Sequence, residues 1–200
     1  TDAGTPGISD PGEELVAMCC EAGIEVTSLP GAAACITALT LSGLPTRRFA
    51  FEAFLPSDKK ERACILQELK NETRTIILYE APHRLVKMLE ELYAELGDRK
   101  ISLCRELTKK HETVFRDTLS QAIAWYKENP PKGECVMVLA GRPREELVLE
   151  ERQKWENMSL EEHLAIYEKE GMSRKDAMKQ VAKDRGIRKR DVYQALLNQE

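Results

Sequence analysis

The sequence contains no apolar run of about 18 or more residues, so it offers no segment that could cross a membrane as a helix. Its first residues do not resemble a signal peptide either. The six cysteines include no pair with the C-x-x-C spacing that zinc and redox sites use. We therefore expect a cytoplasmic protein without a metal site, whose cysteines are reduced and serve mostly in packing.

The chain also lacks an initiator methionine, since it opens on Thr1. Residues 1–12 are rich in glycine and proline, as a loop with unusual backbone angles requires. We expect this loop to follow a strand that precedes Thr1, and we expect the chain to be a fragment of a longer protein.

Length and composition indicate a globular protein. Two hundred residues, 42% hydrophobic and 32% charged, suffice for one large domain or two small ones. The net charge of −4 combines 30 basic with 34 acidic residues, which leaves room for local patches that attract a polyanion. RNA is therefore not excluded as a partner.

The hydrophobic pattern predicts alternating helices and strands. Helices are expected at residues 13–21, with Asp10 as the cap, and at 32–42, 59–70, 85–96 and 119–128. Extended segments are expected at 24–29, 49–54, 73–80, 101–104 and 135–140, and a further segment of unassigned type, 111–116, precedes the helix at 119–128. This order is typical of an α/β sheet.

The C-terminal part differs in pattern. Residues 142–156 are charged with little periodicity, which favours a linker. Three helices follow, the second capped by Ser173 and ended by Gly186. The spacing of Ala182, Gly186 and Val192 suits a helix-turn-helix, although this signal is weak. Residues 171–200 hold eight basic and four acidic residues, so the tail is locally basic.

The opening loop carries the most specific motif. Glycine removes the side chain that would block a ligand, and proline fixes the loop before binding. An ordinary tight turn would have the same composition.

This loop resembles the Asp-Ala-Gly-x-Pro-Gly-x-Ser-Asp-Pro-Gly signature of the ribosomal RNA small subunit methyltransferase I family, which methylates a cytidine 2′-hydroxyl in small-subunit ribosomal RNA. The resemblance covers roughly residues 1–141. It continues through Pro30-Gly31-Ala32-Ala33-Ala34, Ser42-Gly43-Leu44-Pro45, Phe51-Glu52-Ala53-Phe54-Leu55-Pro56, Tyr79-Glu80-Ala81-Pro82-His83-Arg84 and Arg105-Glu106-Leu107-Thr108-Lys109.

The resemblance implies a two-domain α/β fold of the tetrapyrrole methylase type. Its parts would be the remainder of an N-terminal cofactor domain (1–46), a second α/β domain (47–141), the linker (142–156) and a helical, helix-turn-helix-like tail (157–200). The cofactor S-adenosylmethionine would bind in the cleft between the two α/β domains. The implied cofactor-binding residues are Gly4, Thr5, Pro6, Ile8, Ala33, Ala34, Tyr79, Ala81 and Pro82.

One cofactor loop departs from the family pattern. The family often has Pro-Ser or Pro-Cys where this chain has Ala32-Ala33, so any contact from a side-chain hydroxyl is lost there. Main-chain contacts survive that change. Tyr79, taken alone, would more often be a buried strand residue than a ligand contact.

Methyl transfer to a ribose hydroxyl requires alignment and a base or a nearby cation. The candidate catalytic residues are His83, Glu106 and Lys109, with Glu112 also in this region, and the sequence does not rank them. The candidate RNA-binding residues are Arg84, Arg105, Lys110, Arg188, Lys189 and Arg190. A solvated charged surface, or a tail that only packs, would explain these basic residues equally well.

Three alternatives remain open at this point. A methyltransferase of the same fold could act on a tetrapyrrole precursor or on a diphthamide precursor. A non-enzymatic nucleic-acid-binding protein could keep the fold without the activity. For the enzyme, the resemblance implies a homodimer that acts on ribosomal RNA or the 30S subunit.

Overall fold

The computed structural model describes residues 4–156 and 158–197, so the first three residues of the opening motif and the last acidic residue of the tail lie outside the described residues. By their internal contacts, the residues form two units, Thr1–Arg142 and Pro143–Glu200. In the part of the chain that the structure describes, no helix is long and apolar enough to span a membrane.

The first unit is built on a five-stranded mixed sheet with the strand order β1-β2-β5-β3-β4. Its strands are β1 (Phe49–Phe54), β2 (Thr75–Glu80), β3 (Lys100–Arg105), β4 (Thr113–Thr118) and β5 (Cys135–Leu139). β1 and β2 are parallel, whereas β5 is antiparallel to β2 and β3, and β4 is antiparallel to β3. β1, β2 and β3 therefore end at the same edge of the sheet.

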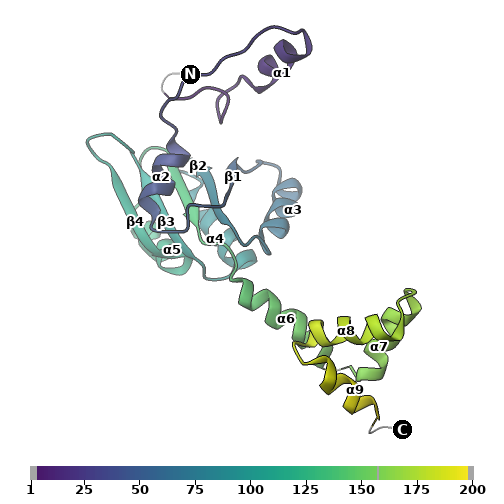
Figure 1. Cartoon of the computed structure of the whole chain (residues 1–200). Helices are drawn as coiled ribbons and strands as arrows, with labels where there is room; N and C mark the ends of the chain where they lie inside the picture. Colours follow the sequence, from purple (N-terminus) through teal and green to yellow (C-terminus); the bar gives the residue numbers. More distant parts are fainter. Residues whose placement is uncertain (1–3, 157, 198–200) are drawn as a thin grey trace. The chain divides into compact units, whose positions relative to one another are not determined.

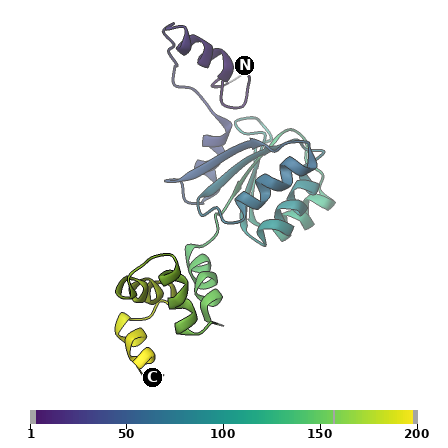
Figure 2. The same ribbon diagram turned by 90° about the vertical axis from the view of Figure 1, so that its right-hand side faces the viewer.

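Helices cover both faces of this sheet (Figures 1 and 2). α2 (Ala34–Ser42) lies on one face, and α3 (Lys59–Leu69), α4 (Leu85–Leu96) and α5 (Leu119–Glu128) lie on the other. Strand β2 has cores on both sides, because Ile77 packs in the cluster with α2 while Ile76 and Leu78 pack in the cluster with α4. Burial on both faces explains why this strand is apolar at consecutive positions.

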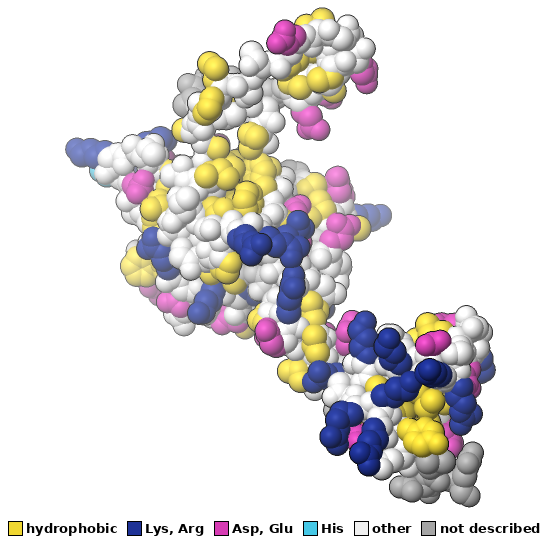
Figure 3. Space-filling view, viewed as in Figure 1, with side chains coloured by type: hydrophobic (Ala, Val, Ile, Leu, Met, Phe, Trp, Pro, Cys, Tyr) yellow, Lys and Arg dark blue, Asp and Glu magenta, His cyan; other side chains and the backbone are white. Residues whose placement is uncertain are grey.

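The N-terminal segment departs from the sequence prediction. Helix α1 (Glu13–Glu21) forms as expected, but Gly12 precedes it and no side chain caps it, so the assignment of Asp10 as the cap was wrong. Residues 24–29 form no strand. A strand needs a neighbour for its backbone hydrogen bonds, and no described residue forms a strand beside this segment. Leu29 is 82% exposed, and apolar side chains lie open on this segment (Figure 3).

Residues 142–156, expected to be a linker, instead contain helix α6 (Arg144–Glu156). The segment lacks an apolar stripe, which is why its pattern resembled a linker, but it consists mostly of Glu, Leu, Arg and other strong helix formers. The ring of Trp155 stacks on that of His163 at a centroid distance of 3.8 Å. α6 is therefore held to the helices of its own unit.

The rest of the second unit consists of α7 (Leu160–Lys169), α8 (Arg174–Arg185) and α9 (Lys189–Leu197). Ser173 caps α8 through the Asp176 amide, and Gly186 ends it in the left-handed conformation, as predicted. Ala182 and Val192 are buried where α8 and α9 meet. The helix-turn-helix spacing therefore corresponds to real packing.

A buried histidine lies in this second core. The Nδ1 atom of His163 accepts a hydrogen bond from Arg185 Nε at 3.1 Å. Burial, together with the positive charge of Arg185, lowers the pKa of His163. Arg185 therefore stabilises the interior of this unit, although it is one of the eight basic residues counted in residues 171–200.

Two smaller expectations need adjustment. Cys35, Cys104 and Cys135 are buried, but Cys20 and Cys64 are exposed, so packing accounts for only about half of the cysteines. α2 belongs to the residues expected in an N-terminal domain, yet it shares a core with the sheet. The domain boundary near Thr46 remains a prediction.

Candidate functional site

A cavity of about 390 Å³ opens at the edge where β1, β2 and β3 end. It is lined by three groups of residues that are far apart in the sequence, from the opening loop, the start of α2 and the ends of the strands. The lining residues are Gly4, Thr5, Ile8, Ser9, Asp10, Ala32, Ala33, Ala34, Thr37, Phe54, Tyr79, Leu107, Thr108 and Glu134. Six of the nine predicted cofactor-binding residues are therefore brought together.

The two predicted cofactor loops touch through their backbones. Thr5 donates its amide to the Ala32 carbonyl at 2.8 Å, and its hydroxyl donates to the same oxygen at 3.2 Å. A Cβ at Gly4 would lie 2.8 Å from that carbonyl oxygen, and a Cβ at Gly31 would lie 2.9 Å from Thr5 Oγ1. Glycine at position 4 is thus a packing requirement of the cavity wall, whereas a side chain at position 31 would have to displace the Thr5 hydroxyl.

Tyr79 connects the sheet to α2. Its hydroxyl oxygen accepts a hydrogen bond from the backbone amide of Cys35 at 3.0 Å. Its ring makes edge contacts with Phe51 and Phe54, at centroid distances of 5.2 and 5.5 Å. Burial raises the pKa of Tyr79, so the phenol stays protonated well into the alkaline range.

We expect Tyr79→Phe to destabilise the first unit by about 1–2 kcal/mol, because the Cys35 amide would lose its partner in a buried position. Urea unfolding followed by Trp125 fluorescence in a Trp155→Phe background would measure this. The matched control is Tyr93→Phe, whose ring is 44% exposed and which should change stability little. Equal effects of the two substitutions would contradict the role of the hydrogen bond.

Several lining residues were missed by sequence reasoning. Asp10 and Glu134 place two carboxylates at the cavity, and Phe54, Leu107 and Thr108 line its wall. For the wall residues, backbone conformation gives the reason: at or beside them, Ala53, Glu106 and Thr108 have positive φ angles of 49°, 50° and 63°. Such angles are costly for residues other than glycine and concentrate at functional sites, but no sequence pattern announces them.

The remaining predicted cofactor residues lie nearby without lining the cavity. Pro6 belongs to the opening loop, and Ala81 and Pro82 follow β2 in the turn that leads to α4. Their cofactor contacts therefore remain predictions.

Of the three candidate catalytic residues, two form an ion pair and the third is exposed. Glu106 and Lys109 form an ion pair at 3.2 Å within the turn after β3, beside the lining residues Leu107 and Thr108. A Cβ at Gly133 would overlap the Glu106 carboxylate, so glycine there makes room for it. His83 is exposed and does not line the cavity. None of the three candidate catalytic residues lines the cavity itself.

The candidate RNA-binding residues divide between the two units. Arg105 donates to Thr113 Oγ1 at 3.2 Å and to the Lys132 carbonyl at 2.8 Å, so it also braces the strand edge. Arg84 contacts Glu80 and Ser57, and Lys110 is exposed. In the second unit, Arg188 pairs with Asp191 at 3.1 Å, whereas Lys189 and Arg190 are exposed.

Comparison with known proteins agrees with this geometry. The family model of tetrapyrrole (corrin/porphyrin) methylases matches residues 1–123. The ribosomal RNA small subunit methyltransferase I of Synechocystis sp. is 48% identical over 201 residues, covering 100% of this chain and 70% of the relative. The protein of the same name from Bacillus subtilis is 46% identical, covering 98% of this chain and 66% of the relative. The chain thus spans about two thirds of these relatives.

Solved structures show the same fold at lower identity. A diphthine synthase superposes with a TM-score of 0.53 at 17% identity, covering 68% of this chain and 57% of that one. The methyltransferase CobJ superposes with a TM-score of 0.52 at 21% identity, covering 69% and 62%. Together with the family model and the much closer sequence relatives, this places the chain in the ribosomal RNA small subunit methyltransferase I family of tetrapyrrole methylases.

Proposed function

We propose that this chain forms most of an enzyme that transfers a methyl group from S-adenosylmethionine to the 2′-hydroxyl of a cytidine in small-subunit ribosomal RNA. The observation that carries the proposal is the gathering of the opening loop, the start of α2 and Tyr79 around one cavity. Relatives named ribosomal RNA small subunit methyltransferase I are 46–48% identical to the chain. Their name supports an RNA substrate over a tetrapyrrole or diphthamide precursor.

The cavity suits the cofactor chemically. Main-chain groups are accessible around Gly4 and Ala33, and aromatic carbon is available from Phe54 and Tyr79. The carboxylates of Asp10 and Glu134 favour a ligand that carries a positive charge. When bound there, S-adenosylmethionine supplies the methyl group.

The residues of the β3 turn would act on the acceptor. Proton removal from a ribose hydroxyl needs a base, and Glu106 directly precedes the lining residues Leu107 and Thr108, which makes its carboxylate our candidate. Lys109, paired with it at 3.2 Å, would offset the negative charge of the developing oxyanion. His83 is retained as an alternative base that would have to approach on RNA binding.

The C-terminal unit would hold the RNA backbone. Figure 3 shows Lys and Arg side chains gathered on its visible face. Lys175, Lys179 and Lys183 are exposed and spaced four residues apart, so they share one face of α8. Lys189 and Arg190 stand at the start of α9, where the helix dipole also favours phosphate. In the cell, we expect a cytoplasmic homodimer that acts on the 30S subunit.

The test is to incubate the protein with purified small ribosomal subunits and radiolabelled S-adenosylmethionine, and to map the labelled nucleotide. Label on a cytidine 2′-oxygen is the expected result. Label on protein or on a tetrapyrrole, with none on RNA, would contradict the proposed substrate. Binding of S-adenosylhomocysteine without any transfer to these acceptors would indicate a non-enzymatic RNA-binding protein.

A further inference from the structure

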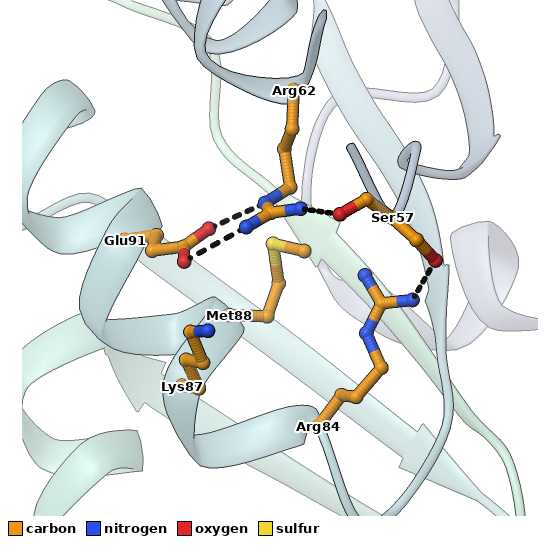
Figure 4. Close-up of a pocket in the computed structure, with 6 residues that line it drawn as sticks. All are labelled: Ser57, Arg62, Arg84, Lys87, Met88 and Glu91. Atoms are coloured by element: carbon orange, nitrogen blue, oxygen red, sulfur yellow. Dashed lines mark hydrogen bonds and ion pairs between the residues drawn. The ribbon is translucent and has the colours of Figure 1, made fainter. Parts of the chain in front are cut away.

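A second cavity, of about 250 Å³, lies between the β1–α3 turn, α3 and α4 (Figure 4). Its lining residues are Ser57, Arg62, Arg84, Lys87, Met88 and Glu91. Met88 packs in the core cluster on the α4 face of the sheet, whereas Tyr79 packs in the cluster with α2. This pocket is therefore distinct from the cofactor cavity and shares no residue with it.

One wall of the pocket is already neutralised. Arg62 forms a bidentate pair with Glu91, with N–O distances of 2.7 and 3.2 Å. Its third nitrogen donates to the carbonyls of Pro56 and Ser57 at 2.9 and 3.0 Å. The guanidinium therefore fixes the β1–α3 turn and contributes little net charge to a ligand.

Two other cations are better placed for an incoming anion. Arg84 Nη1 donates to Ser57 Oγ at 3.2 Å, and its Nε lies 3.4 Å from the carboxylate of Glu80. Glu80 is buried and accepts a hydrogen bond from the Ala81 amide at 2.8 Å, so its carboxylate is fixed in place. It holds the Nε side of the Arg84 guanidinium, while the Nη1 side points toward Ser57 (Figure 4). Lys87 is exposed and forms no ion pair with the residues that the structure describes.

The helix beside these cations adds to the positive potential. α4 has 12 residues, and no side chain caps its N-terminus. Arg84 precedes its first turn and Lys87 lies within that turn, so both side chains flank the positive end of the helix dipole. Phosphates are commonly bound by cationic side chains, hydroxyl groups and the backbone amides at the start of a helix. Arg84, Lys87, Ser57 and the first turn of α4 provide these groups here.

We propose that this pocket binds a backbone phosphate of the RNA substrate, held by Arg84 and Lys87 with the Ser57 hydroxyl as a further donor. The proposal rests on the proposed function. RNA is favoured over a free anion because the two cavities are close along the chain. Tyr79, near the end of β2, lines the cofactor cavity, and Arg84, five residues later and just before α4, lines this pocket. A polymer that reaches the cofactor cavity can therefore also reach the pocket.

The test measures binding of fluorescein-labelled small-subunit RNA to the protein over a series of KCl concentrations. Each lost phosphate contact should reduce the slope of log K against log salt by about 0.7–0.9. We expect this reduction, with weaker binding, for Lys87→Gln and for Arg84→Gln. Lys100→Gln is the matched control, because Lys100 is also exposed but starts β3 at the opposite edge of the sheet.

Lys87→Gln decides the outcome, because Arg84→Gln also breaks the ion pair with buried Glu80 and its loss of binding could reflect misfolding. Equal slopes for Lys87→Gln and Lys100→Gln would overturn the pocket proposal. Methylation of small subunits by the unmodified protein is measured in parallel. If the unmodified protein methylates RNA while Lys87→Gln behaves like the control, only the pocket assignment is wrong. If the unmodified protein neither binds nor methylates RNA, both proposals are wrong.

Discussion

Replacing Gly4 with alanine is expected to weaken the binding of S-adenosylhomocysteine at least tenfold. The added Cβ would lie 2.8 Å from the Ala32 carbonyl oxygen, which is the atom that holds the two cofactor loops together. Overpacking of this kind costs about 1–3 kcal/mol. Because the described part of the opening loop, residues 4–12, contributes no residue to the two hydrophobic cores, we expect that cost to appear as lost binding rather than as unfolding. Isothermal titration calorimetry would measure it.

The matched control for this prediction is Gly7→Ala. Gly7 also has a positive φ angle, 74° against 89° at Gly4, but a Cβ there would meet no atom within 4 Å. It therefore reproduces the backbone strain without the contact. If both variants lost the same affinity, loop strain would be the cause and the contact between the loops would be unimportant.

Gly141→Ala is expected to destabilise the first unit by about 3 kcal/mol, the upper end of the range for overpacking. The chain leaving β5 crosses the segment before β2, where Arg142 donates its amide to the Glu72 carbonyl at 2.7 Å. A Cβ at Gly141 would overlap the carbonyl carbon and oxygen of Thr73. These are backbone atoms, so the clash cannot be relieved by rotating a side chain.

The control for the second prediction is Gly43→Ala. Gly43 ends α2 with a φ angle of 75°, and a Cβ there would meet nothing within 4 Å. Left-handed strain alone should cost about 1 kcal/mol. Urea unfolding followed by Trp125 fluorescence, with Trp155 replaced by phenylalanine, would compare the two. Equal losses for both variants would show that the crossing at Gly141 tolerates a side chain.

The elements of the sheet could be predicted because local chemistry is sufficient for them. The continuous apolar run of β2 matches burial on both faces, and Gly43 and Gly97 end helices where the pattern stops. The prediction for residues 24–29 was wrong because strand formation depends on a partner, which local alternation cannot supply. α6 was missed for the complementary reason, since a helix without an apolar stripe has no periodic signal.

The candidate site divides in the same way. Motif resemblance identified Gly4, Thr5, Ala33, Ala34 and Tyr79, all of which line the cavity. It did not identify Asp10 or Glu134, because an acidic residue near a loop is common and only the fold shows which ones face a cavity. The sequence also did not predict the pocket beside α4, because the residues that line it come from separate elements and share no regular spacing.

By itself, the sequence determined the family, the alternation of helices and strands and six of the residues that line the candidate cofactor cavity. These follow from motifs and periodicities that each lie within a few consecutive residues. Only the tertiary structure decided that α2 packs on the sheet, that Glu106 pairs with Lys109 beside the cavity and that Arg84 faces Ser57 across a second pocket. The physical reason is that burial, ion pairing and close backbone approach depend on which distant segments meet, and that choice is made by packing the whole unit.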